Sequence, residues 1–227
     1  MSDHHFSKCD KIEPVQPFSS QADAQASMDA FVERLQDLLT EHKITNFVGA
    51  VCVSAHADDG RLTRSSNKIV ARGSPDALVD LTLSIGTSVK AAAARVRAAT
   101  GDQPVDGSEP QRASGTTDEA TQAEGGEIDA KVYASEDEAK AALTAFGGEL
   151  KGLVEKYGLC DIVNAASALA PDETGTPAPL GAYVSGMGHP CTLVALAAQA
   201  LDVMNGRHTD AFGEGPKATA ETPHQPH

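Results

Sequence analysis

The chain contains an internal repeat: residues 20–89 align without a gap with residues 135–204. Sixteen of these aligned pairs are identical, and they fall where a fold needs particular residues, at turn glycines, helix-start prolines and apolar helix positions. Such self-similarity predicts two copies of one structural module. The identical pairs include Ser20/Ser135, Phe31/Phe146, Leu35/Leu150, Leu38/Leu153, Val48/Val163, Gly60/Gly175, Gly73/Gly188, Pro75/Pro190, Leu78/Leu193, Val79/Val194 and Leu81/Leu196.

Each copy has the pattern of helix, strand, turn, strand and helix. Apolar residues at spacings of three and four predict a first helix, and Ser20 and Ser135 are suitable N-caps, the latter completed by Glu138 as a capping box. We expect Gly147 and Gly148 to weaken the second copy's helix. The predicted strands are residues 44–54 and 62–72 in copy one, and 159–169 and 180–187 in copy two. The predicted second helices run from Pro75 to about residue 98, and from Pro190 to near residues 205–206.

These elements predict an α+β fold made of two duplicated αββα modules in a pseudo-two-fold unit. One hairpin with two helices is small for independent stability. We therefore expect the two antiparallel hairpins to join in one four-stranded sheet, or to stack, with helices covering them. The predicted divisions are a flexible tail at 1–19, module one at 20–98, an acidic disordered linker at 99–134, module two at 135–206 and a flexible tail at 207–227.

Composition excludes several classes of function. The net charge of −14 opposes attraction to phosphate backbones, which argues against a nucleic-acid partner. The four cysteines form no CxxC pair, and histidines in flexible tails rarely build a metal site, so we expect no metal and no cofactor. The polar N-terminus lacks a signal-peptide core, and no continuous apolar run approaches the length of a membrane span. These features predict a cytoplasmic protein.

A basic stripe in copy one is the first candidate site. Arg64, Lys68 and Arg72 lie four residues apart in the predicted strand 62–72, and regular alternation would place them on one sheet face. Copy two has Pro179, Tyr183 and Met187 at the aligned positions. The stripe is a candidate binding site for an anionic small molecule at the seam between the modules, although a solvated strand face is the plainer interpretation.

The start of the last helix is the second candidate site. Copy two has His189 and Cys191 where copy one has Ser74 and Asp76. A thiol in the first turn of a helix feels the positive end of the helix dipole, and a neighbouring imidazole could assist it. Cys191 is thus a candidate nucleophile, while the structural interpretation is a small buried residue beside an indifferent cap.

These observations favour a non-catalytic binding or assembly protein whose paired modules act on a protein partner. The alternatives are an anionic-ligand binder at Arg64, Lys68 and Arg72, and a thiol-dependent enzyme using Cys191. An acidic nucleic-acid mimic is also compatible with the charge. Since no catalytic motif is present, the sequence leaves catalysis open and favours its absence.

Overall fold

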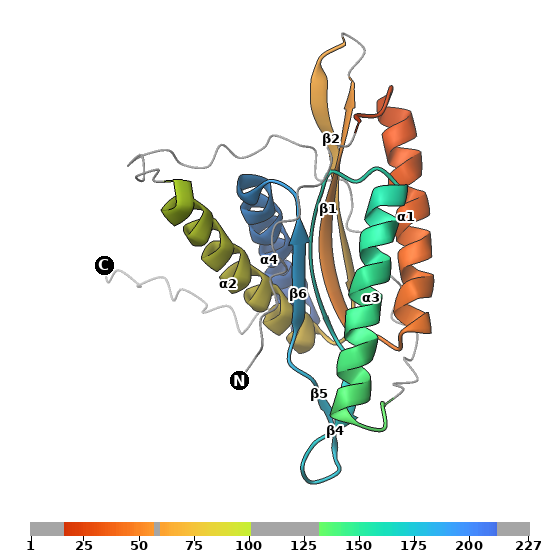
Figure 1. The fold of residues 1–227 in the computed structure, drawn as a ribbon, viewed down its shortest axis with the longest axis vertical. Helices are drawn as coiled ribbons and strands as arrows, with labels where there is room; N and C mark the ends of the chain where they lie inside the picture. The colour runs from red at the N-terminus through yellow and green to blue at the C-terminus, as the bar shows by residue number, and fades with distance from the viewer. Residues whose placement is uncertain (1–15, 57–59, 101–131, 213–227) are drawn as a thin grey trace, which may run out of the picture.

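The computed structural model describes residues 16–56, 60–100 and 132–212, and it has helices and antiparallel strands in mixed order (Figure 1). The prediction of an α+β fold is confirmed at that level. The elements are α1 (Gln21–Glu41), β1 (Asn46–His56), β2 (Leu62–Arg72), α2 (Pro75–Thr100), α3 (Glu136–Lys156), β3 (Asp161–Ser167), β4 (Leu169–Pro171), β5 (Pro177–Pro179), β6 (Tyr183–Met187) and α4 (Pro190–Phe212).

The main sheet has four antiparallel strands in the order β2-β1-β3-β6. Its two central strands come from the two halves of the chain, and their register runs from Asn46 opposite Ser167 to Cys52 opposite Asp161. Midway along this register Gly49 pairs with Asn164, and these two residues are also aligned with each other in the repeat. Of the two arrangements expected for the hairpins, the joined sheet is the one observed.

Two helical layers cover the sheet, α1 and α3 on one face and α2 and α4 on the other (Figure 1). Each layer has its own hydrophobic core. Phe31, Phe47 and Phe146 lie in the core beneath α1 and α3, and Ile85 and Val163 in the core beneath α2 and α4. All residues of β3 are buried, because helices cover this strand on both faces.

Local chemistry explains where the helices begin. Ser20 Oγ accepts a hydrogen bond from the Asp23 N–H at 3.1 Å, and Ser135 Oγ accepts one from the Glu138 N–H at 3.2 Å. Glu138 Oε2 in turn accepts from the Ala134 N–H at 3.0 Å, so the predicted capping box forms with the N–H one residue before the N-cap in place of that of Ser135. Helix α3 continues through Gly147 and Gly148 despite their low helix propensity, because burial of its apolar face stabilises it.

Some predicted boundaries are wrong. The predicted strand 159–169 is divided into β3 and β4, and the predicted return strand 180–187 shortens to β6. Pro177 and Pro179 belong to β5, which pairs with β4 in a separate two-stranded ribbon. Proline cannot donate a ladder hydrogen bond, which agrees with the return strand β6 beginning only at Tyr183 and lying at the edge of the main sheet.

The predicted end of the last helix near residues 205–206 is also wrong, since α4 extends to Phe212. An Asn-Gly pair favours a C-cap, but glycine costs only about 1 kcal/mol within a helix. The tail predicted at 207–227 therefore begins inside α4, and its residues 213–227 lie outside the described part of the chain.

The segments expected to lack structure are hydrogen-bonded to strands where they meet the modules. The Phe18 N–H donates to Ser54 O at 2.9 Å, and the Tyr133 N–H donates to Leu169 O at 2.8 Å. Residues 1–15 and 101–131, which make up most of the predicted tail and linker, lie outside the described residues.

One stretch of α2, Pro75–Arg95, is long and apolar enough to cross a membrane by length and composition alone. Leu78, Leu81 and Ile85 of this stretch pack in the core against the sheet. A core helix passes the same test, so the prediction of a protein without a membrane segment stays a prediction.

Adjacent glycines of α3 provide a test of how β6 packs. A Cβ atom added at Gly147 would overlap the Tyr183 hydroxyl, whereas one added at Gly148 would meet nothing within 4 Å. We expect Gly148→Ala to raise the free energy of unfolding by about 1 kcal/mol through helix propensity. Gly147→Ala should lower it by about 1 kcal/mol or more, because Tyr183 must move. Urea denaturation of both variants measures the difference, and equal stabilisation would contradict this packing.

Candidate functional site

The predicted basic stripe is not assembled as expected. A β-bulge lies between Val53 and Ser54, so Val53 pairs with Ser66 but Ser54 pairs with Arg64. The regular alternation that would align Arg64 with Lys68 and Arg72 is therefore interrupted, and the side chain of Arg64 lies outside those described.

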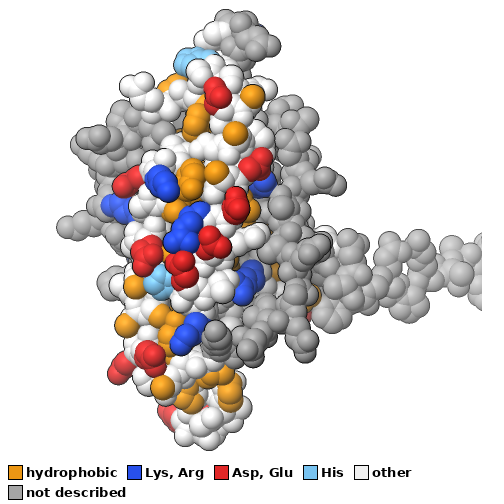
Figure 2. Space-filling view, turned by 90° about the vertical axis from the view of Figure 1, so that its right-hand side faces the viewer, with side chains coloured by type: hydrophobic (Ala, Val, Ile, Leu, Met, Phe, Trp, Pro, Cys, Tyr) orange, Lys and Arg blue, Asp and Glu red, His pale blue; other side chains and the backbone are white. Residues whose placement is uncertain are grey.

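Lys68 and Arg72 lie beside α1. Lys68 Nζ is 2.6 Å from Asp29 Oδ1, and Arg72 donates to Thr40 Oγ1 at 3.1 Å. Both residues belong to β2, which β1 separates from β3, so they lie at the edge of the main sheet. The predicted position of these residues at the seam between the two modules is therefore wrong. Acidic and basic side chains are interspersed over the α1 and α3 face (Figure 2). Anion binding by these residues stays a prediction.

The second predicted pair lies at the start of α4. His189 is exposed, and its carbonyl accepts the N–H groups of Thr192 and Leu193, which makes it the helix N-cap. Cys191 is in the first turn of α4, as predicted, but its side chain is outside those described. The proposal that Cys191 is a nucleophile stays a prediction.

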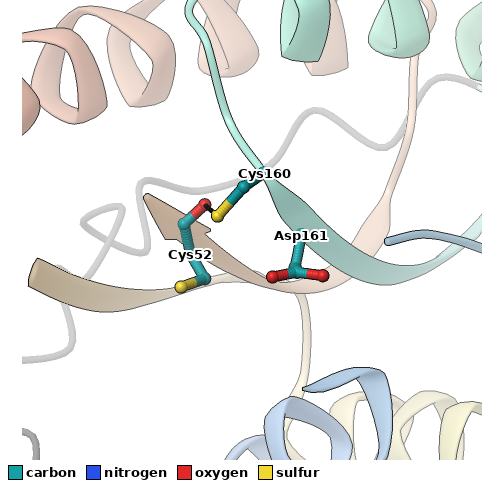
Figure 3. A group of neighbouring side chains, drawn as sticks. All are labelled: Cys52, Cys160 and Asp161. Atoms are coloured by element: carbon teal, nitrogen blue, oxygen red, sulfur yellow. Dashed lines mark hydrogen bonds between the residues drawn. The ribbon is translucent and has the colours of Figure 1, made fainter. Parts of the chain in front are cut away.

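The structure brings together a different group, Cys52, Cys160 and Asp161, which we call the thiol site (Figure 3). One potential ligand atom from each residue lies within 4.8 Å of the other two. Cys52 is fully buried, Asp161 is 4% exposed and Cys160 is half-buried. Cys52 comes from β1, Asp161 is its partner at the start of β3, and Cys160 is the preceding residue.

Main-chain hydrogen bonds hold the thiol site in place. The Cys160 N–H donates to Cys52 O at 3.1 Å, and the Cys160 thiol donates to the same oxygen at 3.2 Å. The Ser54 hydroxyl lies 3.4 Å from Cys160 Sγ. Asp161 Oδ1 accepts the His189 N–H at 2.9 Å, so the carboxylate is bonded to the N-terminus of α4. Positive potential at that end of the helix favours negative charge on the site.

The surroundings of Cys160 alter its acidity. A hydrogen bond with the Cys52 side chain lowers the pKa of the Cys160 thiol, and one with the Ser54 side chain lowers it further. Burial and the Asp161 carboxylate oppose this, but the net pKa lies below the ordinary value for cysteine. The thiolate, which is the form that binds metals and reacts with electrophiles, is therefore easier to reach at Cys160.

A second group occupies the equivalent place at the other end of the β1–β3 pairing. We call Thr45, Asn46 and Ser167 the hydroxyl site, and they align in the repeat with Cys160, Asp161 and Cys52. The Thr45 N–H donates to Ser167 O at 3.2 Å, and so does the Thr45 hydroxyl, also at 3.2 Å. The main-chain arrangement of the two sites is thus the same, while the donor atoms differ.

Glycine precedes the second helix of each half for the same steric reason. Gly73 has φ 129° and Gly188 has φ 126°. A Cβ atom would overlap Asn46 Oδ1 at Gly73 and Asp161 Oδ1 at Gly188. Each glycine therefore lets a strand side chain approach the start of a helix, and this explains one identity of the repeat.

Sequence reasoning missed the thiol site, although one signal was present. The two cysteines align with Ser167 and Thr45, so the copies differ there in chemistry but not in size. Nothing in the sequence shows that Cys52 and Cys160 are neighbours, because that depends on the register between β1 and β3.

Comparison with known proteins gives no family. No protein-family model, no curated protein and no solved structure matches this chain.

The two thiols should differ in reactivity. We expect iodoacetamide to modify Cys160 at least about tenfold faster than Cys52 in the folded protein, since Cys160 is only half-buried, Cys52 is fully buried and the pKa of Cys160 is lowered. Peptide mass mapping over time measures both rates, and the denatured chain, where they should be similar, is the control. Faster modification of Cys52 would contradict the described burial. The same experiment tests Cys191, whose fast labelling the nucleophile hypothesis requires.

Proposed function

We propose that this chain is a non-catalytic binding protein whose thiol site holds a thiophilic divalent metal ion of the Zn²⁺ class. The observation that carries the proposal is the convergence of two sulfur atoms and one carboxylate oxygen within 4.8 Å, two of their three residues being buried. The expectation of a binding protein is retained, but with a metal ion as ligand in place of the predicted absence of metal.

The donor set fits such an ion. Thiolates favour Zn²⁺ and similar soft or borderline cations, and a carboxylate is an acceptable third ligand. Three protein donors leave one position of a tetrahedral site for a water molecule. Because Cys52 and Asp161 are almost inaccessible to solvent, the metal serves binding and not reaction with a large substrate.

Charge also favours a cation. Two thiolates and one carboxylate are acceptors only, and like charges buried at this distance repel each other strongly. A divalent ion compensates most of that charge, and the N-terminus of α4 stabilises the remainder through the His189 N–H. That N–H also orients the carboxylate, as outer-shell partners do in metal sites.

The hydroxyl site supports a role for the thiols beyond folding. There Asn46 Nδ2 donates to Ser167 Oγ at 3.1 Å, so neutral groups satisfy one another without an ion. Since the same main-chain arrangement forms with these residues, the fold does not require cysteine at the matching positions.

We also propose that the two halves are duplicated αββα modules forming a pseudo-dimer. Support comes from the alignment of residues 20–89 with 135–204, the pairing of the equivalent residues Gly49 and Asn164, and the matched glycines Gly73 and Gly188. Such a pseudo-dimer creates two equivalent positions, of which one keeps neutral groups and the other gains metal-binding donors.

Titration with Co²⁺ tests metal binding. The reduced, metal-free protein should take up Co²⁺ with sulfur-to-metal charge-transfer absorption, and Zn²⁺ should displace it, following the usual order of affinities and the preference of thiolates for zinc. Histidine ligands do not produce the sulfur band, so metal bound by the chain's eight histidines is distinguishable.

The hydroxyl site supplies the matched variants. Cys52→Ser, Cys160→Thr and Asp161→Asn together copy it, and should weaken Co²⁺ binding by roughly a hundredfold or more while the chain stays folded by circular dichroism. The reciprocal variant, Ser167→Cys with Thr45→Cys and Asn46→Asp, should add a second sulfur-ligated ion. Equal Co²⁺ spectra for the original chain and the first variant would refute the proposal.

The other functional hypotheses stay predictions. A protein partner, an anionic ligand at Arg64, Lys68 and Arg72, catalysis by Cys191 and a cytoplasmic location have no observation among the described residues that favours them over metal binding.

A further inference from the structure

We propose that Cys52 and Cys160 form an intramolecular disulfide when the metal-free protein meets a peroxide, so that oxidation and metal binding exclude each other at the thiol site. The disulfide rests on the neighbouring thiols alone, whereas the exclusion rests also on the proposed metal-binding function. The chain thereby becomes a binder whose capacity depends on the redox state of its surroundings.

The main chains of the two cysteines are in direct contact. Asp161 is the register partner of Cys52, and Cys160 comes one residue earlier and donates its N–H to Cys52 O at 3.1 Å. Disulfides span Cα separations of about 4.4–6.8 Å, so the residues that they join must be near neighbours of this kind. The Sγ atoms lie within 4.8 Å of each other, so side-chain rotation supplies most of the remaining approach.

Unequal burial of the thiols assigns their roles. Cys160 is half-buried, so a small peroxide can reach its sulfur, whereas Cys52 is fully buried. Cys160 is therefore the residue that is oxidised first, and Cys52 is the resolving thiol beside it. A resolving cysteine next to an accessible one is the arrangement that converts a sulfenic acid into a disulfide.

The reaction balances with hydrogen peroxide as the oxidant. Cys160 sulfur attacks one peroxide oxygen, the O–O bond breaks, and Cys160 sulfenic acid and one water molecule form. Cys52 sulfur then attacks Cys160 sulfur, the S–O bond breaks, and the hydroxyl leaves with the Cys52 proton as a second water molecule. The two sulfur atoms together lose two electrons, and the peroxide gains them.

Disulfide formation removes both sulfur donors from the metal site. A metal ligand must be a thiolate, and a bridged sulfur no longer has that form. Asp161 alone remains, still bonded to the His189 N–H. One carboxylate does not hold a Zn²⁺-class ion tightly, so oxidation releases the metal, and bound metal protects the thiols.

The experiment uses the full-length chain, first metal-free and then saturated with Zn²⁺. After peroxide treatment and quenching, the chain is denatured and alkylated, and intact mass and peptide mapping count the modified cysteines. In metal-free protein we expect Cys9 and Cys191 to be alkylated and the Cys52 and Cys160 peptides to be joined. Saturating Zn²⁺ should slow this joining at least about tenfold, because it occupies both thiolates.

Two variants test the disulfide and its protection by Zn²⁺ separately. Cys160→Thr should leave Cys52 open to alkylation after the same treatment. Asp161→Asn keeps both thiols and should form the disulfide while losing much of the protection by Zn²⁺. Four alkylated cysteines in the oxidised original chain, or a bridge through Cys9 or Cys191, would overturn the disulfide.

Failure of the two proposals can be told apart. A Cys52–Cys160 bridge in a protein that shows no sulfur-ligated Co²⁺ would support the disulfide and refute the metal site. Sulfur-ligated Co²⁺ in a protein that does not form this bridge would support the metal site and refute the disulfide. Equal rates of bridging with and without bound Zn²⁺ would overturn the mutual exclusion.

Discussion

The antiparallel pairing of β1 with β3 is the interaction on which the rest of the structure depends. It joins the two halves through main-chain hydrogen bonds, from Asn46 opposite Ser167 to Cys52 opposite Asp161. A single hairpin would leave one edge of each central strand unpaired. Once the strands are joined, the sheet is wide enough to separate two cores, one beneath α1 and α3 and the other beneath α2 and α4.

The same pairing brings together the residues of both the thiol site and the hydroxyl site. Its two ends are equivalent in geometry, so a main-chain carbonyl receives an N–H from Thr45 at one end and from Cys160 at the other. Neutral side chains satisfy each other at the hydroxyl site, whereas the thiol site concentrates groups that become anions when deprotonated. A cation compensates the negative charge that forms when the thiols are deprotonated, and a disulfide removes both thiols, which is why the two proposals concern the same atoms.

Much of the secondary structure could be predicted because its determinants are local. Apolar spacing and the serine caps located α1 and α3, and proline marked the starts of α2 and α4. Errors occurred where tertiary contacts override local preference. The last helix continues beyond Gly206, and a bulge at Val53 and Ser54 interrupts the alternation on which the basic stripe depended. Neither departure has a distinct signature in the sequence.

By itself the sequence determined the four helices of the described residues, the approximate positions of the main strands and the repeat, since periodicity and caps depend on residues close in the chain. Only the tertiary structure decided which strands of the two halves are neighbours and in which register. That register brings Cys160 to Cys52 across a separation of 108 residues. A shift by one residue would move Asp161 to the opposite face of the sheet. Every residue of β3 is buried, the polar ones included, so no alternation of buried and exposed positions specifies the register in advance.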